Sequence, residues 1–243
     1  MELVKIPSGK NKLAAAIHRS TQVTDKLAIL CPGYLDSKDY NGLLYLANDL
    51  AAKGYTVVRF DPTGTWESEG SISDYTTTQY LNDIRSVKNY MLANGTYNFL
   101  LAGGHSMGGR MSLLYAESDP DISKVLAIMS SNKKTLRNNR AVEVNNRDIP
   151  GNPTQNKQYS VPLSFFEDSS KYDTLDKIKG LHIPILLIAG EKDTICPPET
   201  IQKIFDEANE PKKFILVRGV GHDYRRNLDE VKKVNQIILD AIA

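Results

Sequence analysis

The sequence predicts an α/β protein built on a mostly parallel sheet. From residue 27 onward, short apolar runs alternate with longer amphipathic ones, which is the strand–helix order of a sheet covered by helices. The short runs, such as "KLAILC" at 26–31, are apolar throughout rather than at every second residue, as expected for strands buried on both faces. With 243 residues, the chain fits a single domain over residues 1–243.

The start of the chain has a different pattern. Two early strands are predicted at 2–7 and 12–19, joined as a hairpin at Ser8 and Gly9. The apolar run that follows at 26–33 is the first strand of the buried type.

The later elements each carry a local signal. The helix expected at 41–54 has helical apolar spacing and closes at Gly54, and the strand at 55–61 is rich in β-branched and aromatic residues. The amphipathic helix at 76–95 closes at Gly95. The same alternation predicts strands at 97–104, 125–131, 183–190 and 212–219, and helices at 107–118, 198–209 and 227–243.

One segment interrupts this order. Residues 131–180 are polar, rich in asparagine and punctuated by Pro150, Pro153 and Pro162. A structureless loop of that length is uncommon inside a compact domain. We therefore expect an insertion with some structure of its own at 131–180, projecting from one edge of the sheet.

Composition argues against several classes of partner. The formal net charge is +1, with 30 basic and 29 acidic residues, so no global field favours nucleic acid or an anionic membrane. The chain has no apolar run near the length of a membrane span and no basic-then-apolar secretion signal at its start. Cys31 and Cys196 are too few for a disulfide framework. We expect a reduced, cytoplasmic protein.

No cofactor or metal site is predicted. The sequence "GVGHDY" at 219–224 supplies two of the three glycines of a dinucleotide fingerprint, but no strand follows to complete the unit. The sequence has no P-loop, no H-E-x-x-H and no closely spaced set of histidines and cysteines.

The stretch "GGHSMGG" at 103–109 carries the strongest chemical signal. Gly104, Ser106 and Gly108 form a G-x-S-x-G pattern between a predicted strand and a predicted helix. A serine at such a turn takes a strained conformation that lifts its hydroxyl out of the sheet, and its neighbours must be small. The alternative is a glycine-rich turn needed only for tight packing. We expect Ser106 to be a nucleophile.

A serine hydroxyl needs a base, and the chain has four histidines. His18 lies in the early hairpin, His105 is next to Ser106 and should point away from it, and His182 precedes a strand at the opposite edge. His222 follows the strand at 212–219, at the carboxyl edge where ligands bind in open parallel sheets. His222 is therefore the expected base.

The base needs a carboxylate on its other nitrogen. Asp61, Glu191, Asp193 and Asp223 all follow strands at the carboxyl edge. Asp193 lies between the serine and the histidine in chain order, which is the order found in α/β-hydrolases. We expect Asp193 to orient His222, with Glu191 nearer the strand as the alternative.

A tetrahedral intermediate also requires donors for its oxyanion. The backbone N–H of Met107 is one expected donor, because this residue follows the nucleophile. The second should come from the loop "PGYLDS" at 32–37, where Tyr34 is the candidate and Gly33 would allow an unusual backbone. A role for the Tyr34 side chain stays open.

Together these segments resemble the α/β-hydrolase superfamily. More narrowly, they are similar to small bacterial esterases grouped with cinnamoyl and feruloyl esterases and with serine-aminopeptidase-like, lysophospholipase-type hydrolases. The resemblance covers nearly the whole chain and implies a structural role for Asp61. Pro32 departs from the family's frequent histidine before the oxyanion glycine, and Thr65–Trp66 replaces a usual glycine region. The matching segments are "CPGYLDSKD" (31–39), "VVRFDPTGTWESEGS" (57–71), "GGHSMGG" (103–109), "GEKDTICPP" (190–198) and "GVGHDY" (219–224).

By the same resemblance, the insertion at 131–180 corresponds to a cap over the active site. Its basic residues would either attract an anionic substrate or form a solvated face, and its aromatic residues would either line a pocket or dock the cap on the body. The basic set is Lys133, Lys134, Arg137, Arg140 and Arg147, and the aromatic set is Tyr159, Phe165, Phe166 and Tyr172.

The resemblance and the ordered residues imply a serine esterase. It would cleave carboxylic esters of small to medium acyl groups, including aromatic ones of the cinnamoyl type, through an acyl-enzyme. A thioesterase, an acyltransferase or a small peptidase would use the same residues. A non-catalytic ligand-binding homologue would show a damaged triad, which this sequence does not. The expected partner is a small-molecule ester, and a homodimer stays open.

Overall fold

The computed structural model describes residues 1–132 and 142–242. Within them, eight strands form one sheet in the order β1-β2-β4-β3-β5-β6-β9-β10. β1 pairs antiparallel with β2, and β2 antiparallel with β4, whereas the remaining neighbours are parallel. The predicted α/β class with a mostly parallel sheet is confirmed. The strands are β1 (Glu2–Ser8), β2 (Asn11–His18), β3 (Lys26–Cys31), β4 (Thr56–Phe60), β5 (Phe99–His105), β6 (Lys124–Ile128), β9 (Ile185–Gly190) and β10 (Lys212–Val217).

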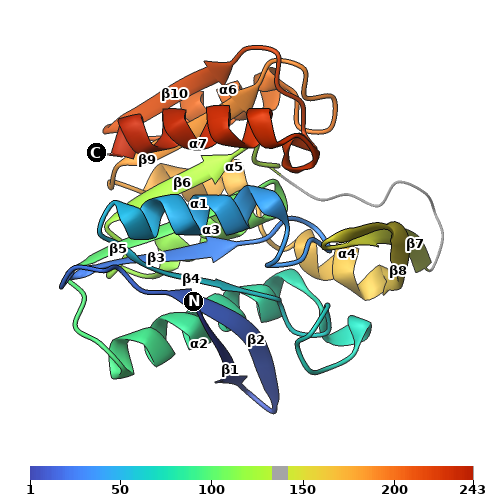
Figure 1. The fold of residues 1–243 in the computed structure, drawn as a ribbon. Helices are drawn as coiled ribbons and strands as arrows, with labels where there is room; N and C mark the ends of the chain where they lie inside the picture. Colours follow the sequence, from blue (N-terminus) through green and yellow to red (C-terminus); the bar gives the residue numbers. More distant parts are fainter. Residues whose placement is uncertain (133–141, 243) are drawn as a thin grey trace.

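Helices cover both faces of the sheet, as Figure 1 shows. Leu46 of one helix and Val234 of another are fully buried in the cluster on one face, whereas Ile84, Leu114 and Ile204 are fully or almost fully buried on the other. α1 and α7 therefore cover the first face, and α2, α3 and α6 the second. These helices are α1 (Asn41–Ala52), α2 (Thr77–Ala93), α3 (Met107–Ser118), α6 (Pro198–Glu207) and α7 (Leu228–Ile242).

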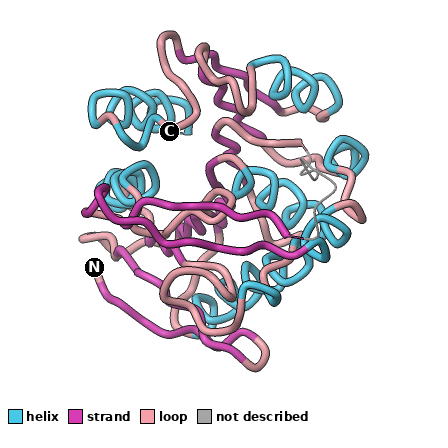
Figure 2. Tube along the Cα trace, turned by 90° about the vertical axis from the view of Figure 1, so that its right-hand side faces the viewer, coloured by secondary structure: helices cyan, strands magenta, loops and turns pink. Residues whose placement is uncertain are grey.

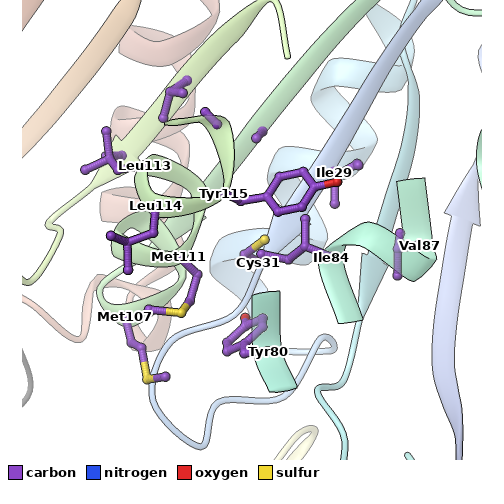
Figure 3. Packing of buried hydrophobic residues seen from close by; sticks show 14 of the residues in the cluster. Ile29, Cys31, Tyr80, Ile84, Val87, Met107, Met111, Leu113, Leu114 and Tyr115 are labelled. Carbon is purple, nitrogen blue, oxygen red and sulfur yellow. The ribbon is translucent and has the colours of Figure 1, made fainter. Parts of the chain in front are cut away.

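The central strands are apolar along their whole length because both of their faces are covered. Every residue of β4 and of β9 is buried, whereas the edge strand β1 has mostly exposed residues. Figure 3 shows the packing beneath the start of α3, where Met107, Met111 and Cys31 gather near Tyr80. This core holds the β5–α3 turn against the loop that follows β3.

The segment at 131–180 contains a second, two-stranded sheet. β7 (Val142–Ile149) pairs antiparallel with β8 (Asn152–Pro162), and the connecting Gly151 has a φ of 74°. Figure 1 places this hairpin beyond the carboxyl ends of the central strands, and Figure 2 shows it crossing in front of them. Short helices follow: α4 (Leu163–Ser169), α5 (Thr174–Lys177) and the 3-10 turn η2 (Ile178–Gly180).

A buried arginine of α3 connects residues 163–180 to the main domain through hydrogen bonds. Arg110 of α3 is fully buried and donates hydrogen bonds to Ser169, Tyr172 and Thr174 over 2.7–3.1 Å. Burial lowers the pKa of this guanidinium to about 10. On the α2 side, the Thr78 backbone and hydroxyl both donate to the carboxylate of Asp168. Residues 163–180 are thus tied to helices α2 and α3.

None of the helices in the described ranges combines the length and the apolar character that crossing a bilayer would take.

Candidate active site

Ser106 occupies a sharp turn between β5 and α3, which we call the elbow. Its backbone has φ 54° and ψ −119°, in the left-handed half of the map that residues with a Cβ rarely adopt. Its N–H donates to the carbonyl of Ile128 on the neighbouring strand β6 at 2.8 Å. Such strain persists only where the surroundings enforce it, and it is typical of functional sites. The turn places the serine at the carboxyl edge of the sheet.

The glycines around this serine are required by close backbone approach. A Cβ on Gly104 would lie 2.6 Å from the carbonyl carbon of Gly108 and would also strike the carbonyl oxygen of Cys31. A Cβ on Gly108 would lie 2.6 Å from the carbonyl carbon of Cys31 and from the carbonyl oxygen of Pro32. The turn and the loop after β3 therefore pack backbone against backbone, which only glycine permits.

The structure brings Ser106, His222 and Asp193 into one hydrogen-bonded chain. His222 Nε2 lies 3.0 Å from Ser106 Oγ, and His222 Nδ1 lies 2.7 Å from Asp193 Oδ2. With the proton on Nδ1, Nε2 accepts the serine's hydroxyl hydrogen. Three side chains that are 29 and 116 positions apart in sequence thus meet at one edge of the sheet.

Asp193 is held rigidly, because both of its oxygens are occupied. Its Oδ1 accepts the backbone N–H groups of Ile195 at 2.8 Å and Cys196 at 2.7 Å, and the side chain is fully buried. The alternative carboxylate Glu191 is exposed and accepts the N–H of Gly219 at 2.7 Å. Of these two carboxylates, only Asp193 contacts His222 among the hydrogen bonds of the described residues.

The remaining expected carboxylates and histidines lie elsewhere. Asp61 is fully buried and accepts hydrogen bonds from Lys38 and Glu67, and burial raises its pKa to about 6. Asp223 is exposed. His18 is bound to Asn48 and Arg59, and His182 is exposed, just before β9.

The loop after β3 lies against the start of α3. Of the two expected oxyanion donors, Tyr34 lies in this loop and Met107 is the first residue of the helix. Met107 begins α3, so its N–H has no acceptor within the helix. The unusual backbone of the loop falls at Leu35, with a φ of 57°, and not at Gly33 as expected. A Cβ on Gly33 would lie 2.5 Å from Oδ2 and 3.2 Å from the carboxyl carbon of Asp36, so the Asp36 side chain would have to move to accept one.

An ion pair between Asp148 and Arg225, which we call the latch, joins the β7–β8 hairpin to the side of the site that carries His222. Asp148 accepts two hydrogen bonds from Arg225 at 2.9 and 3.1 Å, and the guanidinium of Arg225 lies 3.7 Å from the ring centre of Tyr40. The hydrogen bonds from Arg225 lower the pKa of Asp148. Because Arg225 follows closely after His222 in the chain, this latch couples the hairpin to the loop that carries the histidine.

The insertion's aromatic residues are packed into the body. Tyr159, Phe165 and Phe166 are buried in the same core cluster as the rest of that face, and Tyr172 packs against it. Phe165 stacks on Tyr75 with 5.2 Å between ring centres. These contacts dock the segment on the body of the protein. Of the basic set, Lys133, Lys134, Arg137 and Arg140 lie outside the described residues.

One neighbour of the site was not expected from the sequence. The ring of His105 lies against that of His222, and its Nδ1 lies 3.7 Å from Asp36 Oδ2. Burial lowers the pKa of His105, and the adjacent His222 acts in the same direction. The only sequence signal was a histidine beside the nucleophile, which does not indicate what its ring contacts.

Across residues 1–132 and 142–242, no group of histidine, cysteine, aspartate and glutamate side chains is arranged to hold a metal ion.

Comparison with known families agrees with the fold described above. The family model for the alpha/beta hydrolase fold matches residues 27–152, just over half of the chain. The chain therefore belongs to the α/β-hydrolase family.

Individual relatives are more distant. An uncharacterized protein of Mycobacterium tuberculosis is 37% identical over 71 residues, which is 29% of this chain and 24% of that protein. The match thus spans about a quarter of the mycobacterial protein. The human mitochondrial palmitoyl-protein thioesterase ABHD10 is 25% identical over 226 residues, which is 88% of this chain and 72% of that protein.

Solved structures share the whole fold. Est1E from Butyrivibrio proteoclasticus, determined with ferulic acid bound, superposes with a TM-score of 0.80 over 98% of this chain and 99% of its own, at 19% identity. At that identity the likeness concerns the fold alone.

Proposed function

We propose that the protein is a serine hydrolase that cleaves carboxylic esters through an acyl-enzyme. The observation that carries this proposal is the hydrogen-bonded chain from Ser106 Oγ through His222 to Asp193, at 3.0 and 2.7 Å. A histidine in that position can take the serine's proton, while the carboxylate fixes its tautomer and stabilises the imidazolium.

In this mechanism Ser106 Oγ attacks the ester carbonyl carbon as His222 Nε2 takes the hydroxyl proton. The N–H groups of Tyr34 and Met107 would hold the oxyanion of the tetrahedral intermediate. His222 then gives its proton to the departing alcohol oxygen, which leaves the acyl group on Ser106. Water adds to the acyl carbon with His222 again as base, and the acid leaves as Ser106 recovers its proton.

We also propose that residues 131–180 act as a cap. The latch between Asp148 and Arg225 and the contacts of Arg110 with this segment support a fixed position beside the site. Closing an active site in this way would limit water and shape the acyl pocket.

The first test compares Ser106→Ala with wild type on p-nitrophenyl acetate and butyrate and with a fluorophosphonate probe. We expect the variant to lose covalent labelling and at least about a thousandfold of turnover. Ser118→Ala, at the far end of the same helix, is the matched control and should behave as wild type. Equal turnover by Ser106→Ala would refute the proposal, and a folded wild type that does not label would favour a non-catalytic ligand-binding homologue.

A thioesterase is the second candidate, favoured by one observation. The human relative that matches 88% of this chain is named a palmitoyl-protein thioesterase. The acyl-enzyme would be the same, with a thiol as leaving group. Comparing kcat/KM for p-nitrophenyl butyrate, butyryl-CoA and palmitoyl-CoA separates the two, and an added panel of acceptor alcohols and aminoacyl amides tests acyl transfer and peptidase activity.

A further inference from the structure

The inner side of strand β7 faces the loop that carries Tyr34. Side chains alternate along a strand, and here Val142 and Val144 are exposed while Glu143, Asn145 and Arg147 are partly buried. The inner row therefore carries both a carboxylate and a guanidinium toward the proposed oxyanion loop.

Arg147 binds the backbone of that loop directly. Its Nη2 donates to the carbonyl oxygen of Tyr34 at 2.7 Å, and its guanidinium carbon lies 5.8 Å from the centre of the Tyr34 ring. Its Nε is buried without a hydrogen-bond partner among the described residues. Among the described residues, the Arg147 side chain thus makes its hydrogen bond to the Tyr34 carbonyl.

The peptide between Tyr34 and Leu35 is held from both ends. Arg147 binds its carbonyl oxygen, and its N–H donates to the hydroxyl of Tyr75 at 3.3 Å. Leu35 has a positive φ of 57°, a strained conformation that persists only under such restraint. The N–H and the C=O of Tyr34 are joined through the same Cα. Holding the C=O in place therefore limits the orientations that the N–H can take.

The charge of Arg147 also acts on the loop. Burial raises the pKa of the Tyr34 phenol and the nearby Glu143 adds to the rise, whereas Arg147 opposes it. Arg147 thus counters the charge of Glu143 at the Tyr34 side chain.

We propose that Arg147 is a positioning residue that aligns the Tyr34 backbone N–H for oxyanion binding. The inference rests on the proposed function. Arg147 acts through the Tyr34 peptide and does not touch the substrate. Through Arg147, the β7–β8 hairpin contributes to the chemical step in addition to covering the site.

The hairpin itself supplies a matched control. Lys157 is the cross-strand partner of Arg147 in the β7–β8 register. It too binds one backbone carbonyl, that of Trp66, at 2.8 Å, and its Nζ lies 5.6 Å from the centre of that ring. Removing Lys157 loosens the same hairpin at the same level but removes no hydrogen bond of the Tyr34–Leu35 peptide.

The experiment uses the full chain with Arg147→Met, Arg147→Lys and Lys157→Met. For each we would measure kcat and KM on p-nitrophenyl butyrate, the inhibition constant of 2,2,2-trifluoroacetophenone, and the thermal midpoint. This ketone forms a tetrahedral adduct with the serine, so its affinity reports on the oxyanion site, whereas a general loosening of the fold would also move the Lys157 variant.

We expect Arg147→Met to lower kcat by about 10- to 100-fold and to weaken the ketone by a similar factor, with KM changed less than about threefold. Arg147→Lys should recover part of both losses, and Lys157→Met should stay within about threefold of wild type. Equal losses in both methionine variants, or a fall in kcat without weaker ketone binding, would overturn the proposal. Failure of the proposed function would be recognised separately, because wild type would then not label with the fluorophosphonate.

Discussion

The imidazole rings of His105 and His222 lie 4.7 Å apart between centroids, at an angle of 47°. Two imidazolium cations at that separation would repel each other, so one ring must stay neutral when the other accepts a proton. Burial, reinforced by His222, lowers the pKa of His105 below its ordinary value of 6.5. The lowered pKa disfavours a charge on the His105 ring, and it is His222 that lies within hydrogen-bond distance of Ser106.

Replacing His105 with Phe should leave the acid side of the pH–activity profile as it is in wild type. The substitution keeps a ring against His222 and removes a group whose pKa is lowered by burial, so the ring that contacts Ser106 still governs the rise of activity with pH. We expect kcat to fall by less than about tenfold and the midpoint of log(kcat/KM) against pH to stay within about half a unit. A larger displacement, or a change in slope, would mean that His105 itself titrates in the active range.

Asp193→Asn should have a far larger effect than Glu191→Gln. The amide can no longer hold His222 in the tautomer that accepts from Ser106, and such a change lowers kcat by roughly 10⁴ in serine proteases. Among the described residues, the Glu191 carboxylate accepts one hydrogen bond, from the Gly219 backbone N–H, so its variant should keep kcat within about twofold. Steady-state rates on p-nitrophenyl butyrate check both, and a comparable loss in the two variants would contradict the assignment.

The elbow and the fold could be predicted from the sequence because their requirements are local. The need for glycine at 104 and 108 follows from backbone contacts that any strand–serine–helix turn of this kind makes. Buried strands such as β4 are apolar at every position, and that run is visible in the sequence. The order of the segments then placed Ser106 and His222 at one edge of the sheet.

The contacts of the insertion could not be predicted because they depend on the path and register of the hairpin. Arg147 and Tyr34 are 113 positions apart, and Asp148 and Arg225 are 77 apart. In the sequence Arg147 was one of several basic residues that suggested either an anion site or a solvated face. Its partly buried position on the Tyr34 carbonyl follows only from the three-dimensional arrangement, as does the contact between His105 and His222.

Gly108→Ala should destabilise the protein and impair the elbow together. The new methyl group would press on the carbonyls of Cys31 and Pro32, and neither backbone can move without shifting the loop after β3. Overpacking of this kind costs about 1–3 kcal/mol, which for a chain of this size lowers the thermal midpoint by roughly 2–12 °C. We expect slower fluorophosphonate labelling as well. Gly180→Ala is the control, because a Cβ there would first meet Glu117 Cγ, at an ordinary 3.4 Å, and unchanged stability of Gly108→Ala would contradict the packing argument.

Acid should destabilise the protein partly through His18, far from the site. Its Nε2 accepts from Arg59 and its Nδ1 lies 2.9 Å from Asn48, and burial followed by the Arg59 charge lowers its pKa from 6.5 to about 4. The unfolded chain therefore binds this proton more readily, so stability falls as pH drops from about 6.5 toward 4. With about 1.4 kcal/mol for each pKa unit, His18 accounts for roughly 3 kcal/mol of that loss.

His18→Gln keeps an acceptor for Arg59 but cannot titrate. Urea unfolding should therefore show a shallower decline in the free energy of unfolding between pH 7 and 4.5 for this variant than for wild type. Identical slopes for the variant and wild type would show that His18 is already accessible to protons in the folded state.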